Sequence, residues 1–350
     1  MKKKYKIIWI ESICDIESII ENNIVKTKIN SPDYKNWEDQ EKAAEDFRNR
    51  INEYVKIYES LSAKDDGVNS CFIKLINQGE KMIIRNVKGY VESKVISYLM
   101  NLHTGDRPIY FLAHGESEYD KLGLIGGDSS LSEKGLKFCE LLKSYFEKEL
   151  ENIYIDNTIN NSNENNSHNN NSNIYSNKSV LKIEEKPQIF CSTLISSIQT
   201  AEYLSFLNSY KSEKLLDEIN TGFVDGISFK EFSKKFSKEI EERKKNKLYY
   251  RFEMGESYMD VIQRIEPIIF EMERIKSPII VVGHLKMLKC LYGYFAKIPI
   301  EKIPFIKIPP HYVIKFVPEA YGFYETRYEF DIEKKVILKD DRDFISDFDN

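Results

Sequence analysis

The stretch Ile109-Tyr110-Phe111-Leu112-Ala113-His114-Gly115-Glu116-Ser117 is an apolar run that ends in a histidine and a glycine. Five consecutive apolar residues with polar flanks are typical of a buried strand. The pattern recurs at Ile279-Ile280-Val281-Val282-Gly283-His284. A single histidine at a strand end is more often structural than functional. Two of them on one α/β sheet, however, are expected to converge at the carboxyl edge, where such sheets bind ligands.

From residue 108 onward, strand-like and helix-like segments alternate, which predicts an α/β sheet with helices on both faces. We expect strands at 109–113, 188–192, 279–283, 312–317 and 324–330, and helices at 132–148, 195–207, 229–236, 257–274 and 285–295. Ser257 and Asp260 are spaced to cap a helix, and Pro267 should bend it. Earlier in the chain, the patterns predict strands at 5–10, 72–76 and 82–85 and helices at 37–60 and 87–101.

Composition narrows the class of protein. The chain has 350 residues, 41% of them hydrophobic, which suits about two domains. A net charge of −5 argues against a nucleic-acid partner. The five cysteines show no CxxC spacing and indicate free thiols in a reducing compartment. Neither a signal peptide nor an apolar run of membrane-spanning length is present, so we expect a cytoplasmic protein without membrane contact.

Two segments depart from the average composition. Residues 157–178 are almost entirely Asn and Ser, and we expect a disordered insertion on the surface. Residues 336–350 are predicted to form an acidic tail. The charged tract at 241–247 is by default a solvated helix face. His103 and His311 lack ligand-like spacing to cysteines or carboxylates, so we expect neither a metal site nor a cofactor.

Few reactions need two histidines at one sheet edge. One of them is phosphoryl transfer through a phosphohistidine, in which one imidazole attacks phosphorus and the other donates to the phosphoryl oxygens.

The segment Arg107 to Leu131, RPIYFLAHGESEYDKLGLIGGDSSL, resembles the opening of the bisphosphatase domain in the 6-phosphofructo-2-kinase/fructose-2,6-bisphosphatase family. Further similar stretches follow in order at 197–202, 218–219, 255–258, 283–284 and 319–322. The resemblance implies a three-layer α/β/α phosphoglycerate mutase-like domain with a mostly parallel sheet at 106–335. It also implies fructose 2,6-bisphosphate or fructose 6-phosphate as ligand, and a homodimer.

The resemblance further implies roles for single residues. His114 would be the nucleophile, Glu218 the general acid and then general base, and His284 the second imidazole. The residues implied to bind substrate are Gly126, Arg243, Lys247, Tyr258 and Lys289, the last of which stands where the family has arginine.

Several positions depart from the family pattern. Two phosphate-binding arginines are replaced by Ala113 and Ser196, and a glutamine is replaced by Leu285. Asp120 stands in place of an asparagine and brings negative charge toward the phosphate, while Phe229 replaces a tyrosine. The lysines that could compensate are Lys121, Lys286 and Lys289.

Residues 1–105 resemble the last third of the family's kinase domain, which implies a partial P-loop-kinase-like α/β segment. Its nucleotide- and sugar-binding positions would fall on Asn23, Lys28, Arg50 and Tyr54. The sequence contains no GxxxxGK[ST] loop to hold the β- and γ-phosphates. We therefore expect no kinase activity from this chain, which is then either a fragment of a longer product or a truncated relic.

Three functions remain open at this point. The first is a fructose-2,6-bisphosphatase weakened by the missing arginines. The second is an inactive pseudoenzyme that binds sugar phosphate or regulates a partner. The third, ranked lowest, is a phosphoglycerate mutase or broad-specificity phosphatase of the same superfamily.

Overall fold

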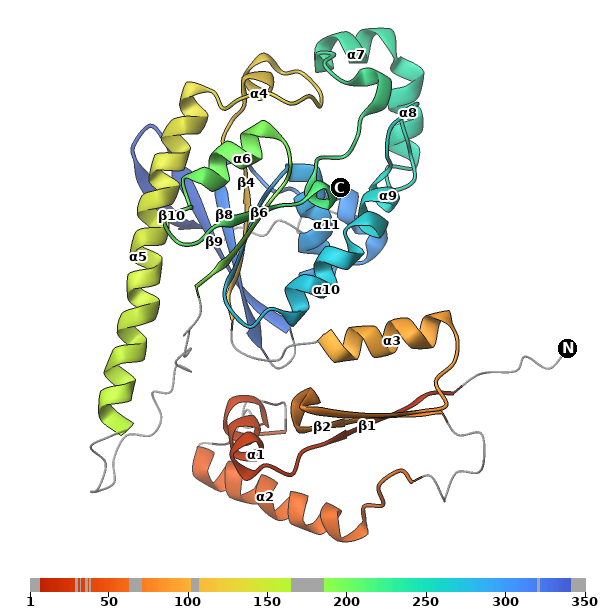
Figure 1. Ribbon diagram of the computed structural model, residues 1–350, viewed down its shortest axis with the longest axis vertical. Coiled ribbons are helices and arrows are strands. Elements are labelled where there is room, and N and C mark those ends of the chain that lie inside the picture. Colours follow the sequence, from red (N-terminus) through yellow and green to blue (C-terminus); the bar gives the residue numbers. More distant parts are fainter. Residues whose placement is uncertain are drawn as a thin grey trace, which may run out of the picture. The chain divides into compact units, whose positions relative to one another are not determined.

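The computed structural model describes residues 7–28, 31, 33–34, 37, 39–62, 71–101, 107–164, 186–319 and 322–340. The chain divides into two units, Met1–Thr104 and Gly105–Asn350, each with its own sheet (Figure 1).

The first unit is built on a three-stranded sheet. Strand β1 (Trp9–Ile13) pairs in parallel with β2 (Phe72–Ile76), which pairs in antiparallel with β3 (Lys81–Arg85). Its helices are α1 (Glu17–Asn23), continued by a π-helical turn at Ile24–Lys28, then α2 (Gln40–Ile57) and α3 (Tyr90–Asn101). A small core forms where Ile24 meets Ala44 of α2.

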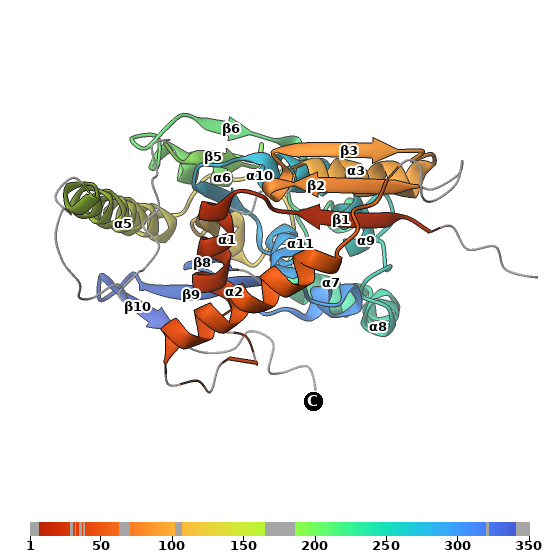
Figure 2. The ribbon, with the colours of Figure 1, turned by 90° about the horizontal axis from the view of Figure 1, so that it is seen from below.

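The second unit has a seven-stranded sheet in the order β10-β9-β8-β4-β7-β5-β6, and Figure 2 shows β10 and β6 at its two edges. Its parallel part consists of β4 (Ile109–Ala113), β7 (Ile279–Gly283), β5 (Gln188–Cys191) and β6 (Tyr210–Ser212). Beside β4, an antiparallel meander adds β8 (Tyr312–Glu319), β9 (Gly322–Asp331) and β10 (Val336–Asp340).

Side chains that alternate along β4 divide the core into two layers. Ile109 and Phe111 pack with α9 (Tyr258–Arg264), α10 (Glu266–Arg274) and α11 (Leu285–Phe295). Tyr110 and Leu112 pack on the other face with α5 (Glu133–Glu164) and α6 (Ile195–Glu202). Successive side chains of a strand point to opposite faces of the sheet, so a strand that is apolar throughout needs helices to cover both faces. The three-layer α/β/α prediction is confirmed.

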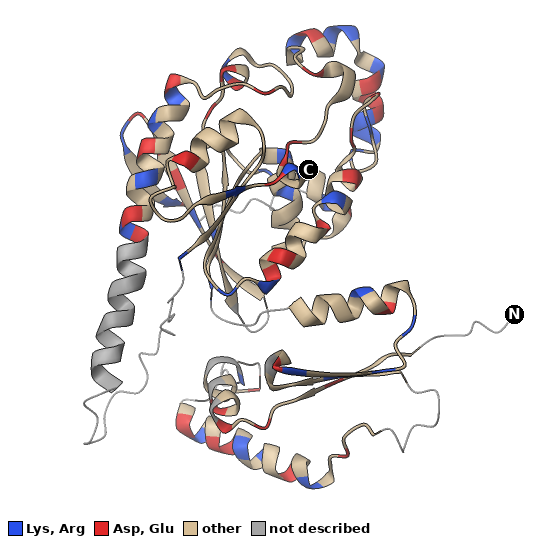
Figure 3. Ribbon diagram, in the orientation of Figure 1, with Lys and Arg blue, Asp and Glu red and all other residues tan. Residues whose placement is uncertain are grey.

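Three shorter helices lie between these elements: α4 (Glu118–Leu122), α7 (Phe229–Lys235) and α8 (Ser237–Lys245). Helices α7 and α8 carry a dense mixture of charges, whereas the central strands carry almost none (Figure 3). None of the helices among the described residues has the length and apolar character needed to cross a membrane.

The segment at 257–274 has the predicted start but forms two helices rather than one bent helix. Ser257 and Asp260 form a reciprocal capping box at the start of α9, which confirms the expected helix start. The helix breaks at Ile265, and Pro267 lies in the first turn of α10, where its missing N–H costs no hydrogen bond.

Two expectations about irregular segments need correction. Helix α5 continues to Glu164, into the Asn-rich tract expected to be disordered from residue 157. A helix that has already formed propagates at the cost of one ordered residue per new hydrogen bond, so helical structure continues into the tract. The rest of the tract, 165–178, lies outside the described residues. The acidic tail was also placed too early, because Val336–Asp340 pairs with β9 as strand β10.

Candidate active site

The register of β4 and β7 brings the two strand-end histidines together. Ala113 lies opposite Gly283 in this parallel pair, so His114 and His284 leave the sheet edge side by side. The main-chain N–H of His114 donates to the carbonyl of Gly283 at 2.9 Å, and the two imidazole centroids are 4.6 Å apart.

His114 is held in one tautomer by its own loop. Its Nδ1 lies 2.7 Å from the carbonyl oxygen of Gly115. Because a carbonyl only accepts, Nδ1 carries a proton, and in the neutral imidazole the lone pair is on Nε2. This leaves Nε2 as a nucleophilic atom.

Two glycines allow this loop to lie against the start of α5. A Cβ on Gly115 would lie 2.7 Å from the carbonyl oxygen of Gly135, and a Cβ on Gly135 would lie 2.2 Å from that of Glu116. The main-chain N–H of Gly115 donates to Thr200 Oγ1 at 3.0 Å, which fixes the loop to α6 as well. Glycine is required here for close backbone approach rather than for a special φ angle.

His284 is buried, with 5% of its surface exposed, and its Nε2 lies 2.8 Å from the hydroxyl of Ser192. Burial lowers the pKa of His284 well below its usual value, and the nearby charges of His114, Lys286 and Arg264 lower it further. His284 is therefore a neutral imidazole at the N-terminus of α11.

Glu218 projects from the loop that follows β6. One carboxylate oxygen accepts from the N–H of Ile219 at 2.8 Å, and the other lies 3.5 Å from the N–H of Lys286. Arg264 of α9 secures this loop by donating to the carbonyls of Leu215, Asp217 and Glu218. Sequence reasoning missed both Arg264 and Ser192, because their contacts join residues far apart in the chain.

A cleft of about 520 Å³ contains the three catalytic candidates, His114, Glu218 and His284. Gly126 also lines it, with a φ of +69°, and a Cβ there would lie 1.9 Å from the Asp225 carboxylate. Gly126 therefore has a structural reason to be glycine, independent of any ligand.

A smaller hollow of about 130 Å³ is lined by Arg243, Lys247 and Tyr258 together with Phe229 and other apolar side chains. Lys247 donates to the carbonyl of Pro304 at 2.8 Å. Burial lowers the pKa of Lys247 to about 8, with further contributions from Lys289, Arg243 and Lys286. Burial raises the pKa of Tyr258, so its hydroxyl stays protonated and can donate.

The positions that lack arginine place no cation in the cleft. Ala113 ends a buried strand, and Ser196 lines the cleft with only 4% of its surface exposed. Asp120 also lines the cleft, but its carboxylate accepts from the N–H and hydroxyl of Ser117, at 2.9 and 2.7 Å. Its charge therefore also serves the capping box of α4.

Lysines supply positive charge to the same cleft. Lys286, Lys289 and Lys307 line it, whereas Lys121 lies on the surface of α4, 3.7 Å from Glu118. Burial lowers the pKa of Lys289, while Glu218 opposes that effect. The sequence indicated Lys286 and Lys289 but gave no reason to select Lys307.

The kinase-like positions do not line any of these cavities. Arg50 donates to the hydroxyl of Tyr34 at 2.9 Å, and Lys28 lies over the ring of Phe47 at 6.0 Å. Tyr54, further along α2, is 63% exposed. Asn23 ends α1 and is half-buried.

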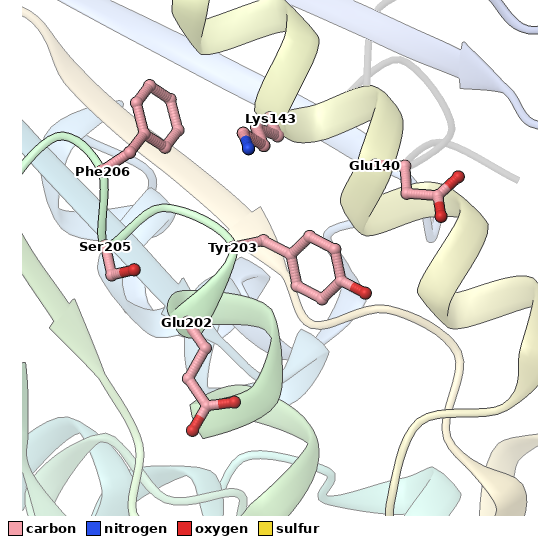
Figure 4. Close-up of a pocket in the computed structure, with 6 residues that line it drawn as sticks. All are labelled: Glu140, Lys143, Glu202, Tyr203, Ser205 and Phe206. Carbon is pink, nitrogen blue, oxygen red and sulfur yellow. The ribbon is translucent and has the colours of Figure 1, made fainter.

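Another hollow, between α5 and the segment after α6, lacks the catalytic candidates that line the cleft (Figure 4). Its lining residues, Glu140, Lys143, Glu202, Tyr203, Ser205 and Phe206, include one cation, two carboxylates and no histidine. Among the described residues, no group of three or more His, Cys, Asp or Glu side chains is placed to hold a metal ion.

The fold and the paired imidazoles define the class of histidine phosphatases. The model of the histidine phosphatase superfamily (branch 1) matches residues 178–331, and that of 6-phosphofructo-2-kinase matches residues 1–106. The chain belongs to the 6-phosphofructo-2-kinase/fructose-2,6-bisphosphatase family. Among solved structures, a putative alpha-ribazole-5'-P phosphatase from Escherichia coli superposes with a TM-score of 0.48 at 14% identity, over 63% of this chain and 95% of that chain.

Three curated relatives carry the family name. The protein from Caenorhabditis elegans is 36% identical over 334 residues, which cover 95% of this chain and 65% of the relative. The 6-phosphofructo-2-kinase/fructose-2,6-bisphosphatase 3 of Rattus norvegicus is 36% identical over 318 residues, which cover 91% of this chain and 51% of the relative. The Arabidopsis thaliana protein is also 36% identical, over 93% of this chain and 39% of the relative. The chain thus spans less than two thirds of each of these relatives.

Proposed function

We propose that the second unit removes the 2-phosphate of fructose 2,6-bisphosphate through a phosphohistidine at His114. The observation that carries this proposal is the pair of imidazoles 4.6 Å apart, in which Nδ1 of His114 is committed to the Gly115 carbonyl. Nε2 then remains to attack phosphorus. The name shared by the curated relatives supports the choice of substrate.

In the first step, a bond forms between Nε2 of His114 and phosphorus while the bond from phosphorus to the fructose O2 breaks. Glu218 gives its proton to the departing oxygen, and fructose 6-phosphate leaves. In the second step, Glu218 removes a proton from water as the water attacks the phosphohistidine. Inorganic phosphate leaves, and both His114 and Glu218 return to their starting states.

His284 and the lysines act on the equatorial oxygens. When the Ser192 hydroxyl donates to Nε2 of His284, the imidazole proton is on Nδ1, which can then donate to the phosphoryl group. Lysine supplies charge but lacks the bidentate fork of arginine. Removing one preorganised donor typically costs about 10²–10³ in rate, so we expect slow turnover.

The experiment is a single-turnover assay with fructose 2,6-bisphosphate labelled at the 2-phosphate, comparing wild type with His114→Ala. Label on the protein, followed by free labelled phosphate, supports the proposal if both disappear in the variant. Release of phosphate that His114→Ala leaves unchanged contradicts the proposed mechanism.

A second candidate is a sugar-phosphate-binding pseudoenzyme. The observation in its favour is that Ala113 and Ser196 bring no charge, while Arg243, Lys247 and Tyr258 share the adjacent hollow. It predicts that fructose 6-phosphate raises the melting temperature while no label is transferred to His114.

A further inference from the structure

Lys286 lines two cavities, which its sequence pattern does not reveal. It is the second residue of α11, directly after the buried His284 and Leu285. The cleft of His114 and the hollow of Arg243 share two lining residues, Ile125 and Lys286. Lys286 is therefore the cation common to both cavities among the described residues that line them.

Four of the cations around these cavities lie outside ion pairs in the described part of the chain. In the described part of the chain, no carboxylate lies within ion-pair distance of Arg243, Lys247, Lys286 or Lys289. Two of the three lining carboxylates are engaged elsewhere, Asp120 by Ser117 and Glu256 by Arg264 at 2.8 Å. The third, Glu218, only partly offsets the positive charge of the cleft, through Lys289.

The charge of Lys286 also reaches groups in both cavities. It contributes to the lowered pKa of Lys247 in the hollow and of Lys289 and His284 in the cleft. Like charges this close repel one another, and a bound anion relieves the repulsion. Uncompensated cations gathered in a partly buried cavity therefore favour an anionic ligand.

We propose that Lys286 is a shared cation that binds the phosphoryl group at His114 and the phosphate in the adjacent hollow at the same time. A lysine ammonium has three donors on a flexible four-carbon stem, which allows one group to contact two phosphates. Lys286 thereby provides charge to a cleft in which Ala113 and Ser196 supply none, and it favours ligands with two phosphate groups. The inference rests on the proposed function for the identity of the group at His114.

The test measures two probes separately in phosphate-free buffer. Fructose 6-phosphate is titrated by calorimetry. Inorganic phosphate is followed through the imidazole NMR signals of His114 and His284, so that only occupancy of the cleft is counted. The variants are Lys286→Met, Lys286→Arg, Lys289→Met for the cleft and Lys247→Met for the hollow. Lys143→Met is the matched control, because Lys143 lines a hollow without histidine (Figure 4).

We expect Lys286→Met to weaken the binding of both probes by about tenfold or more, since each phosphate loses a charged hydrogen bond. Lys286→Arg keeps both affinities within about threefold. Lys289→Met weakens mainly phosphate, Lys247→Met weakens mainly fructose 6-phosphate, and Lys143→Met changes neither.

The inference is overturned if Lys286→Met weakens one probe alone or neither, or if wild type binds neither probe. A chain that binds both probes through Lys286 but never labels His114 overturns the proposed hydrolysis and keeps the shared cation. The two failures are therefore distinguishable.

Discussion

The guanidinium of Arg264 donates to the main-chain carbonyl of Glu218 at 3.2 Å, and also to that of Asp217 at 2.6 Å. The same guanidinium pairs with the carboxylate of Glu256 at 2.8 Å. Arg264 therefore fixes the backbone of the loop that carries the proposed general acid, without itself lining the cleft.

The first prediction concerns this positioning role. Arg264→Lys keeps the charge but cannot reproduce several hydrogen bonds in a fixed fork, so Glu218 should lose its alignment. We expect kcat for fructose 2,6-bisphosphate to fall by about 10–100-fold while KM changes by less than about threefold. Small misplacements of catalytic groups have effects of this order. Steady-state and single-turnover kinetics measure both quantities.

The control is Arg251→Lys, because Arg251 also pairs with a carboxylate of α9, that of Asp260, but its side chain is 56% exposed. An exposed ion pair contributes little to stability, so this variant should behave as wild type. Equal losses in both variants, or a rise of KM alone at Arg264, would show that Arg264 has no special role in positioning Glu218.

The second prediction follows from the lowered pKa of His284. Because the folded state keeps this imidazole neutral, the unfolded state binds more protons as the pH falls below about 6.5. Stability from this group is thus present above the unfolded pKa and is lost as the pH falls. We expect the free energy of unfolding of wild type to decrease between pH 6.5 and 5 by up to about 1.4 kcal/mol per pH unit from this group.

The measurement is urea unfolding across that pH range, with His284→Gln as the test variant. The variant should show a shallower pH dependence, even where it is less stable overall. His311, whose pKa burial also lowers, provides the comparison through His311→Gln. Identical slopes for wild type and His284→Gln would contradict a neutral His284 in the folded state.

The third prediction tests the close approach of Gly135 to Glu116. A Cβ at Gly135 would lie 2.2 Å from a main-chain oxygen, so Gly135→Ala must move the loop after His114. We expect a loss of about 1–3 kcal/mol in the free energy of unfolding, as for other overpacked sites, together with weaker labelling of His114. Gly322→Ala is the control, because its Cβ would meet only the tip of Lys297 at 3.9 Å. If both variants are equally stable, the loop has room that the backbone distances do not indicate.

The sequence was sufficient where apolar residues follow a regular strand or helix pattern. Strands β4 and β7 and helix α11 have the predicted bounds, because buried runs that end in polar residues leave little freedom. Strand β6 was missed since Tyr210-Lys211-Ser212 is short and has no apolar alternation. Strand β10 is a half-exposed edge, and its position depends on pairing with β9 rather than on its own pattern.

In the cleft, too, some residues could be placed from the sequence and others could not. The pairing of His114 with His284 could be predicted, because two strand ends fix both residues at one sheet edge. The positions of Lys286 and Lys307 could not be predicted, since the direction of a long side chain depends on how loops pack around it. The engagement of Asp120 with Ser117 was also hidden, although the two residues have the spacing of a capping box.

The fourth prediction reverses one departure from the family pattern. Asp120 lines the cleft and brings a negative charge near the site where we propose phosphate binds. Asp120→Asn removes that charge, and its amide oxygen can still accept from Ser117, so α4 should keep its start. Removing one repulsive charge across a partly solvated cleft should stabilise a bound phosphate by roughly 1 kcal/mol, which is about fivefold in affinity. We therefore expect faster labelling of His114 and tighter binding of inorganic phosphate, both more evident at low ionic strength.

Asp128→Asn, which removes an exposed carboxylate outside the cleft lining, is the charge-matched control. An increase of the same size in both variants would mean that net charge, rather than Asp120 in the cleft, limits the reaction.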